Sequence, residues 1–296
     1  MRHSVTSLPR DPAEPWEMPY TPAEGGSFFR ARRASIPYTP RRAEDIPAGC
    51  LESLREVCGI RVLGQVLVIP RAVRSTGWRG ELVIAPNSVL ALGDRAVGLW
   101  TEKPEPGIRA AIQLADLAAI EDMIVLLYGR LSFVSASARL TVRYNTVARQ
   151  EMEPALLELR RRLAGPQQDV PVEAAGRELP FKWKVLVSDP RVRLVEGSPV
   201  VFSFASVPGR SRRDPSNGQL VALNPFELVY LREPFESSGR YGVDSVVVPR
   251  SRVTEVREQP DGLAISSNGA TIALSMAPLL RGAALRWAGP ERAAQP

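Results

Sequence analysis

Apolar residues recur along this chain in short runs, and the runs form two sets with the same order. The first set has an apolar stretch that ends at Ile69, a basic turn, and a second stretch from Leu82 to Leu92. The second set repeats this order between Phe202 and Leu231. Short apolar runs bounded by turn residues are typical of β-strands. The pattern therefore predicts a pair of strands at the start of each half.

The spacing of prolines agrees between the two sets. In each set one proline stands twelve residues before the second strand begins, and another lies within that strand. A proline inside a strand removes a ladder hydrogen bond, so we expect it to kink the strand. The outer and inner prolines are Pro70 and Pro86 in the first set, and Pro208 and Pro225 in the second.

Further along each half, apolar and polar residues alternate with a period of two, which indicates half-buried antiparallel strands. A helical pattern with an early proline and a closing glycine follows in each half. The alternating residues are Leu131, Phe133, Leu140, Val142 and Tyr144 in the first half, and Leu263, Ile265, Ile272, Leu274 and Met276 in the second. The helical residues are Met152, Leu156, Leu159 and Leu163, with Pro154 expected in the first turn and Gly165 at the end, and then Leu280, Ala284 and Trp287, between Pro278 and Gly289.

Antiparallel strands closed by one C-terminal helix resemble the pleckstrin homology (PH) domain, and "IQLADLAAIED" followed by "GRLSFVSASARLTVRY" is similar to bacterial PH-like relatives. The resemblance implies a mainly β (α+β) fold of two tandem PH-like antiparallel barrels, each closed by a C-terminal helix. Another small antiparallel barrel, duplicated, is the alternative. The expected parts are an extended proline-rich arm at 1–47, a first PH-like domain at 48–165, a linker at 166–180 and a second PH-like domain at 181–290.

The resemblance also implies binding, because lipid-reading PH domains clasp phosphoinositide headgroups with basic residues in the turn between their first two strands. Each half of this chain has three arginines in the matching turn, but the lysine of the family pattern is absent. An anionic lipid, an acidic protein surface and a merely solvated turn are all compatible with these residues. The candidate residues for an anionic partner are Arg71, Arg74 and Arg79, and Arg210, Arg212 and Arg213. Two tryptophans, Trp78 and Trp100, either contact a partner or cover their own barrel.

Length and charge fit this picture. A chain of 296 residues is long enough for two cores and a tail. The net charge is +6, and only Lys103, Lys182 and Lys184 are lysines, so arginine provides most of the basic surface. Arginine suits interfaces with carboxylates and phosphates. No apolar stretch approaches the about 20 residues that cross a bilayer, and the N-terminus lacks an apolar signal core, so we expect a cytoplasmic protein.

Few residues could support catalysis. The only histidine is His3, which removes histidine-based triads, metal sites and the commonest general base. No phosphate-binding glycine motif occurs, and the adjacent pair Glu121 and Asp122 should point to opposite faces of its segment. Cys50 and Cys58 are eight residues apart on a predicted helix, which favours two buried thiols over a disulfide or a metal site. We therefore expect no enzyme activity, no cofactor and no metal.

The arm is rich in proline and yet carries aromatic residues. Proline denies it helix interiors and central strands, so it should be extended. The motif PYTP occurs twice, at Pro19–Pro22 and Pro37–Pro40. We expect the arm to lie on a partner, although it could also fold back on its own domains or bind in an aromatic groove of a barrel. The candidate anchors are Trp16, Met18, Tyr20, Phe28, Phe29, Ile36 and Tyr38.

Together these features predict a non-enzymatic scaffold or accessory subunit, peripheral at the inner membrane. Its expected partners are protein subunits of a larger membrane-bound complex, photosynthetic or otherwise, with the arm strapped along neighbouring subunits. The alternative is a free membrane-surface adaptor that binds anionic lipid through the arginine turns. Nucleic acid is not expected, because the basic residues are not interleaved with a stacking platform.

Overall fold

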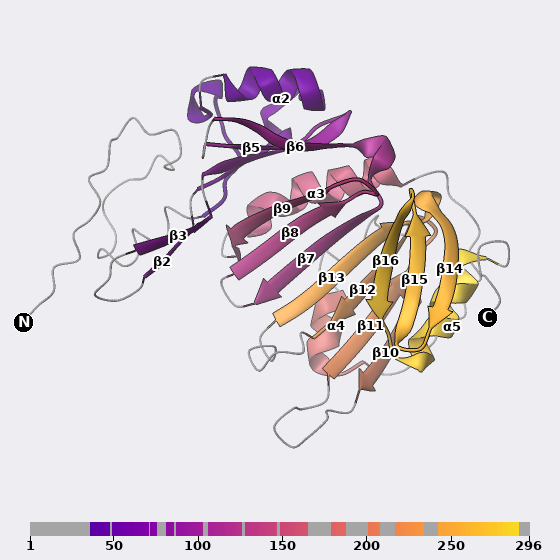
Figure 1. Cartoon of the computed structure of the whole chain (residues 1–296). Helices are drawn as coiled ribbons and strands as arrows, with labels where there is room; N and C mark the ends of the chain where they lie inside the picture. Colours follow the sequence, from indigo (N-terminus) through magenta and orange to yellow (C-terminus); the bar gives the residue numbers. More distant parts are fainter. Residues whose placement is uncertain are drawn as a thin grey trace, which may run out of the picture. The chain divides into compact units, whose positions relative to one another are not determined.

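The structure is a computed structural model in which the backbone divides into two compact units (Figure 1). One unit comprises Met1–Gln113 and Val142–Met152, and the other comprises Leu114–Thr141 and Glu153–Pro296. The two units are described separately below. The residues that the structure describes are 36–47, 49–70, 72–75, 81–85, 87–102, 106–125, 128–146, 149–164, 179–187, 201–207, 217–233 and 242–289.

Most of the described secondary structure is antiparallel β. The first unit contains η1 (Ala43–Asp45), α2 (Cys50–Cys58), η2 (Leu63–Gln65), β1 (Val66–Ile69), β2 (Ala72–Ser75), β3 (Glu81–Ala85), β4 (Ser88–Leu92), β5 (Ala96–Thr101) and β6 (Gly107–Gln113). The second contains η4 (Leu114–Asp116), β7 (Ala119–Val125), β8 (Tyr128–Val134), α4 (Phe181–Val187), β10 (Val201–Val207), β11 (Asn217–Leu223), β12 (Glu227–Arg232), β13 (Gly242–Pro249), η7 (Arg250–Arg252), β14 (Val253–Gln259), β15 (Gly262–Ser267), β16 (Ala270–Ser275) and α5 (Pro278–Ala288). Two elements cross the boundary between the units: β9 (Arg139–Asn145) and α3 (Arg149–Leu163).

The first unit is built on a four-stranded sheet in the order β1-β4-β5-β6, with helix α2 packed on one face. One face of α2 is apolar and buried, and Gly59 ends the helix in the left-handed conformation (φ 73°) that favours glycine. Both cysteines lie on this buried face, as the sequence predicted. The buried residues of α2 are Cys50, Leu51, Leu54 and Cys58.

A long hairpin opens the first repeat. Strand β1 pairs with β4, and beyond a break β2 pairs with β3, so that Ile69 lies opposite Ser88 and Ala72 opposite Ala85. Both strands of the hairpin are interrupted at the same level. Pro86, where the sequence predicted a kink, lies between β3 and β4 and outside the described residues.

The second unit contains a seven-stranded sheet in the order β10-β11-β12-β13-β7-β8-β9. Strands β7 to β9 come from the first repeat and β10 to β13 from the second, and the two groups join where β13 pairs with β7. At this seam Val246 lies opposite Glu121 and Ser245 opposite Asp122.

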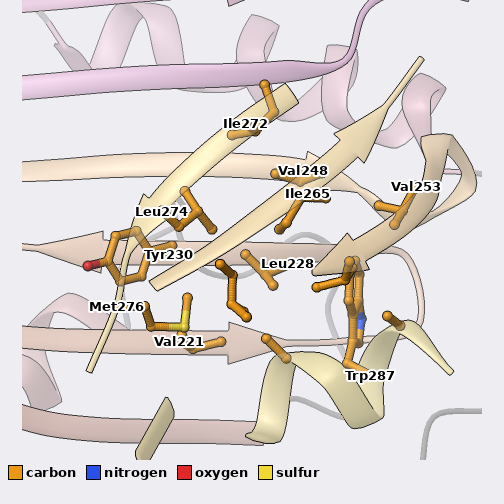
Figure 2. Close-up of a cluster of buried hydrophobic side chains, with 14 of the residues drawn as sticks. Val221, Leu228, Tyr230, Val248, Val253, Ile265, Ile272, Leu274, Met276 and Trp287 are labelled. Atoms are coloured by element: carbon orange, nitrogen blue, oxygen red, sulfur yellow. The ribbon is translucent and has the colours of Figure 1, made fainter. Parts of the chain in front are cut away.

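A separate three-stranded sheet, β14-β15-β16, and helix α5 pack with the seven-stranded sheet around one apolar core. Figure 2 shows side chains from β11, β12, β13, β14, β15 and β16 in one apolar cluster, to which α5 contributes Trp287. The indole N–H of Trp287 donates to the backbone carbonyl of Asn224 over 2.8 Å. The alternation of buried and exposed positions predicted for this region is confirmed in β16, whereas β15 is buried at nearly every position, Leu263 and Ile265 included.

The order of elements repeats along the chain. In the first repeat the opening hairpin, β5, β6, η4, β7, β8, β9 and α3 follow one another, and in the second the order is β10, β11, β12, β13, η7, β14, β15, β16 and α5. The chain is thus mainly β with added helices, as expected. Among the described strands, however, no sheet closes into a barrel, since each of the four sheets runs from one edge strand to another.

Two predictions about prolines are wrong. Pro225 does not kink one long strand, because it lies in the turn between β11 and β12. The side-chain oxygen of Asn224 accepts hydrogen bonds from the backbone N–H groups of Phe226 and Glu227, both at 2.8 Å, and this reverses the chain. Pro154 lies inside α3 and not in its first turn, because the helix already begins at Arg149. The earlier start brings Met152, which is buried, into the helix. The helix continues through Pro154 although the proline removes one backbone hydrogen bond.

Candidate binding surfaces

One of the predicted arm residues, Tyr38, lies on the protein's own first sheet. The backbone of Tyr38 exchanges two hydrogen bonds with Val68 of β1, at 3.0 and 2.9 Å. The Tyr38 side chain is 6% exposed, and burial raises the pKa of its hydroxyl well above the usual range. Ile36 is half-buried. The second PYTP motif therefore covers the edge of β1. The other predicted anchors, Trp16, Met18, Tyr20, Phe28 and Phe29, lie outside the described residues.

The predicted arginine turns fall almost entirely outside the described residues. The exception is Arg74, whose backbone is described. It lies in strand β2 opposite Leu82 and not in the turn. Strands β2 and β3 extend the hairpin beyond β1 and β4, so Arg74 belongs to a strand. The other five, Arg71, Arg79, Arg210, Arg212 and Arg213, lie outside the described part of the chain, as does Trp78.

Trp100 belongs to the core of the first unit. It lies in β5 opposite Val89 and is 5% exposed. Of the two interpretations of this residue, the structure therefore supports the one in which the indole covers its own fold.

A small polar pocket lies beside the seam of the second unit, where edge strand β16 approaches the face of β12, β13 and β7. Arg232 donates from Nε to Oδ2 of Asp244 over 3.0 Å, and the Tyr230 hydroxyl donates to the backbone carbonyl of Ser275. Burial raises the pKa of Tyr230 far above its usual range, and the nearby Asp244 adds to this effect while Arg232 opposes it. The pocket thus contains an ion pair between Arg232 and Asp244, in which only Oδ2 of Asp244 has a hydrogen-bond partner, beside a phenol whose pKa is raised.

The pocket is small and lined mainly by polar side chains. Its volume of about 130 Å³ is enough for a small cluster of water molecules. Glu121 at its rim is held by both guanidinium nitrogens of Arg139, whereas Asp122 points to the opposite, buried face of β7, as the sequence predicted. No nucleophile with an adjacent base lines the pocket.

Helix α4 presents a surface that the sequence analysis missed. Trp183, 3% exposed, packs on Gly218 of β11, and its ring centroid lies 5.4 Å from that of Phe204 in β10. On the outer side, Phe181 is 82% exposed and Val185 is 57% exposed. Residues four apart lie on one face of a helix, so these two side chains form an apolar stripe. The i, i+4 spacing of Phe181 and Val185 was the available signal.

Lysine side chains flank the apolar stripe of α4. The Lys182 ammonium contacts the Glu233 carboxylate at 2.5 Å, and Glu233 also accepts a hydrogen bond from the backbone N–H of Gly218 at 2.6 Å. Lys184 is exposed on the same turn as Phe181 and Val185. Trp183 therefore holds α4 against β11, and Lys182 holds it to Glu233 just after β12, while the stripe faces outward.

Within the described ranges, no group of histidine, cysteine, aspartate and glutamate side chains is arranged to hold a metal ion. None of the described helices is long and apolar enough to cross a membrane. No known protein-family model matches the chain, and no curated protein is significantly similar to it in sequence.

Proposed function

We propose that this chain is a non-enzymatic accessory subunit that docks on the cytoplasmic face of a membrane protein complex. In this proposal the two repeats are PH-like binding modules, and the arm before Ile36 tethers the protein to neighbouring subunits. The inner-membrane location and the protein partners belong to the same proposal.

The observation that carries the proposal is the architecture of the second repeat. A four-stranded meander, a three-stranded meander and a C-terminal helix enclose one core, which is the arrangement that PH-like domains have in common. PH-like domains act by binding, and the cavity beside the seam offers no catalytic constellation. A scaffold function also fits an extended sheet that joins strands from both repeats.

The test is affinity capture from native membranes in mild detergent. The full chain is compared with a chain that begins at Ile36, which retains the Tyr38 pairing with β1 and the buried Ile46. We expect the full chain to retain one stoichiometric membrane complex through a high-salt wash, and the shortened chain to lose it. Thermal melting of both chains verifies that the shortened protein remains folded.

Two results would contradict the proposal. Equal recovery of the complex by both chains would show that the arm is no tether. If neither chain recovers a defined complex, the proposal that the protein is an accessory subunit is wrong.

A further inference from the structure

The outer face of α4 differs from that of the corresponding helix of the first repeat. Each repeat has a short helix before its first strand, α2 in one and α4 in the other. Helix α2 exposes Glu52, Arg55 and Glu56, which is the usual polar outer face. Helix α4 exposes Phe181 and Val185 with Lys184 between them. An outward apolar stripe on a helix that is already docked indicates a second contact surface.

The position of the stripe is rigid. A methyl group added to Gly218 would lie 2.5 Å from the Trp183 ring, so the indole fits closely against the backbone of β11. Lys182 and Glu233 hold the other side of the same turn. Because both contacts are made by the inner half of α4, Phe181 and Val185 cannot turn inward without breaking them. The contacts of Trp183 and Lys182 therefore keep Phe181 and Val185 on the outer face of α4.

The charges around the stripe favour one kind of partner. The α4 sequence FKWKVLV contains two of the three lysines of the chain and no acidic residue. Exposed apolar side chains interleaved with lysine are the pattern of helices that lie in the interface of an anionic bilayer, where lysine reaches the headgroups and the apolar face enters the acyl boundary. The net charge of +6 adds a long-range attraction to the same surface.

We propose that α4 is a membrane-contact element, with Phe181 and Val185 entering the headgroup region of an anionic bilayer and Lys184 at the phosphate level. This inference rests on the proposed peripheral function and names the surface that faces the lipid. Two inserted side chains give weak, reversible binding that is measurable at high lipid concentration, since even a single acyl chain anchors only reversibly. The contact therefore orients a protein that its complex already holds near the membrane.

The test uses pure lipid vesicles, so that it does not depend on any protein partner. Co-sedimentation is measured with vesicles of phosphatidylcholine mixed with phosphatidylglycerol, and with vesicles of phosphatidylcholine alone. We expect the full chain to bind the anionic vesicles and Phe181→Ser/Val185→Ser to bind them about tenfold more weakly. Lys184→Gln should weaken binding to the anionic vesicles only, and added salt should reduce the difference.

The matched control is Val62→Ser/Leu279→Ser, which removes two other exposed apolar side chains, 61% and 57% exposed, outside α4. It should bind vesicles as the unmodified chain does. The inference is overturned if the unmodified chain does not bind, if both double variants bind alike, or if the α4 variant loses capture of a protein complex while it keeps vesicle binding. Because the vesicles contain no protein, a failure of the proposed docking function leaves this result unaffected.

Discussion

Arg160 of α3 and Glu227 of β12 form a buried ion pair between the closing helix of the first repeat and a strand of the second. Both side chains are largely buried, and the guanidinium contacts both carboxylate oxygens, with Nε at 3.1 Å from Oε2. Near the end of the same helix, the Ser251 hydroxyl donates to the backbone carbonyl of Leu163 over 3.1 Å. These contacts fasten α3 to the second repeat, so the two repeats share interior structure.

We expect Arg160→Met to destabilise the protein by about 3–5 kcal/mol, because it leaves the Glu227 carboxylate buried without its partner. The double variant Arg160→Met/Glu227→Leu should recover most of this loss, since neither charge of the pair then remains. Urea unfolding of the full chain measures both. Arg161→Met is the matched control, because Arg161 is exposed and forms a surface ion pair with Glu158, at 3.6 Å. If Arg160→Met lowers the free energy of unfolding no more than Arg161→Met does, the buried pair does not stabilise the protein as expected.

Gly218→Ala should loosen α4. The added methyl group would meet the Trp183 ring at 2.5 Å, so either the helix or strand β11 must shift. Overpacking of this kind costs about 1–3 kcal/mol. Thermal melting reports the loss, and a red shift in tryptophan fluorescence reports exposure of the indole. Gly64→Ala is the control, because nothing lies within 4 Å of the added methyl group there. Equal stability of the two variants would rule out close packing at Gly218.

Backbone amides of β7 and β13 should be among the slowest to exchange with deuterium. Both strands are central in the seven-stranded sheet, so their ladder bonds open only when a large part of the second unit unfolds. Edge strand β10 should exchange faster. Hydrogen exchange followed by mass spectrometry separates these segments. Fast exchange in β7 together with slow exchange in β13 would mean that the seam opens independently.

Cys50 and Cys58 should be inert to thiol reagents in the folded protein. Both are fully buried, and burial raises the pKa of Cys50 to about 12 and that of Cys58 to about 11. At pH 8 neither thiolate should react with Ellman's reagent until denaturant is added. Reaction in the folded state at the rate of the unfolded chain would contradict the burial of α2.

The same pKa shifts predict how stability changes with pH. Since the thiol pKa values are higher in the folded state than the about 8.5 of an unfolded cysteine, the folded protein holds its thiol protons longer. The resulting stability is complete below about pH 8.5 and falls as the pH rises through about 11. Cys58→Ala should flatten this decline, measured as the free energy of unfolding at several pH values. An unchanged slope would mean that the Cys58 thiol titrates alike in both states.

The sequence predicted the elements that rest on local periodicity. The alternation through Leu263, Ile265 and Ile272 identified β15 and β16, and the apolar face with Leu280, Ala284 and Trp287 identified α5. Such patterns are visible because one face of each element is buried.

Other features depend on contacts that no local pattern encodes. Strands β7 and β13 alternate as any half-buried strand does, and nothing in either one specifies that they pair across about 120 residues. The segment that becomes α4 alternates apolar and basic residues from Phe181 to Val185, which is typical of a strand. In the structure the segment is helical, and Trp183 packs against Gly218 of β11. At Pro225, the hydrogen bonds of Asn224 decide between a kink and a turn.

The shared sheet also bears on how the protein is made. A ribosome releases the chain from its N-terminus, so β7 is synthesised long before β13, its neighbour in the sheet. Until about residue 250 has emerged, the outer edge of β7 has no strand to cover it, and a nascent chain with an open edge is prone to aggregate. A product that terminates after the first repeat would keep this edge permanently exposed. Correct maturation of the first repeat therefore waits for translation of the second, and nascent chains paused between the two are where a chaperone would be needed.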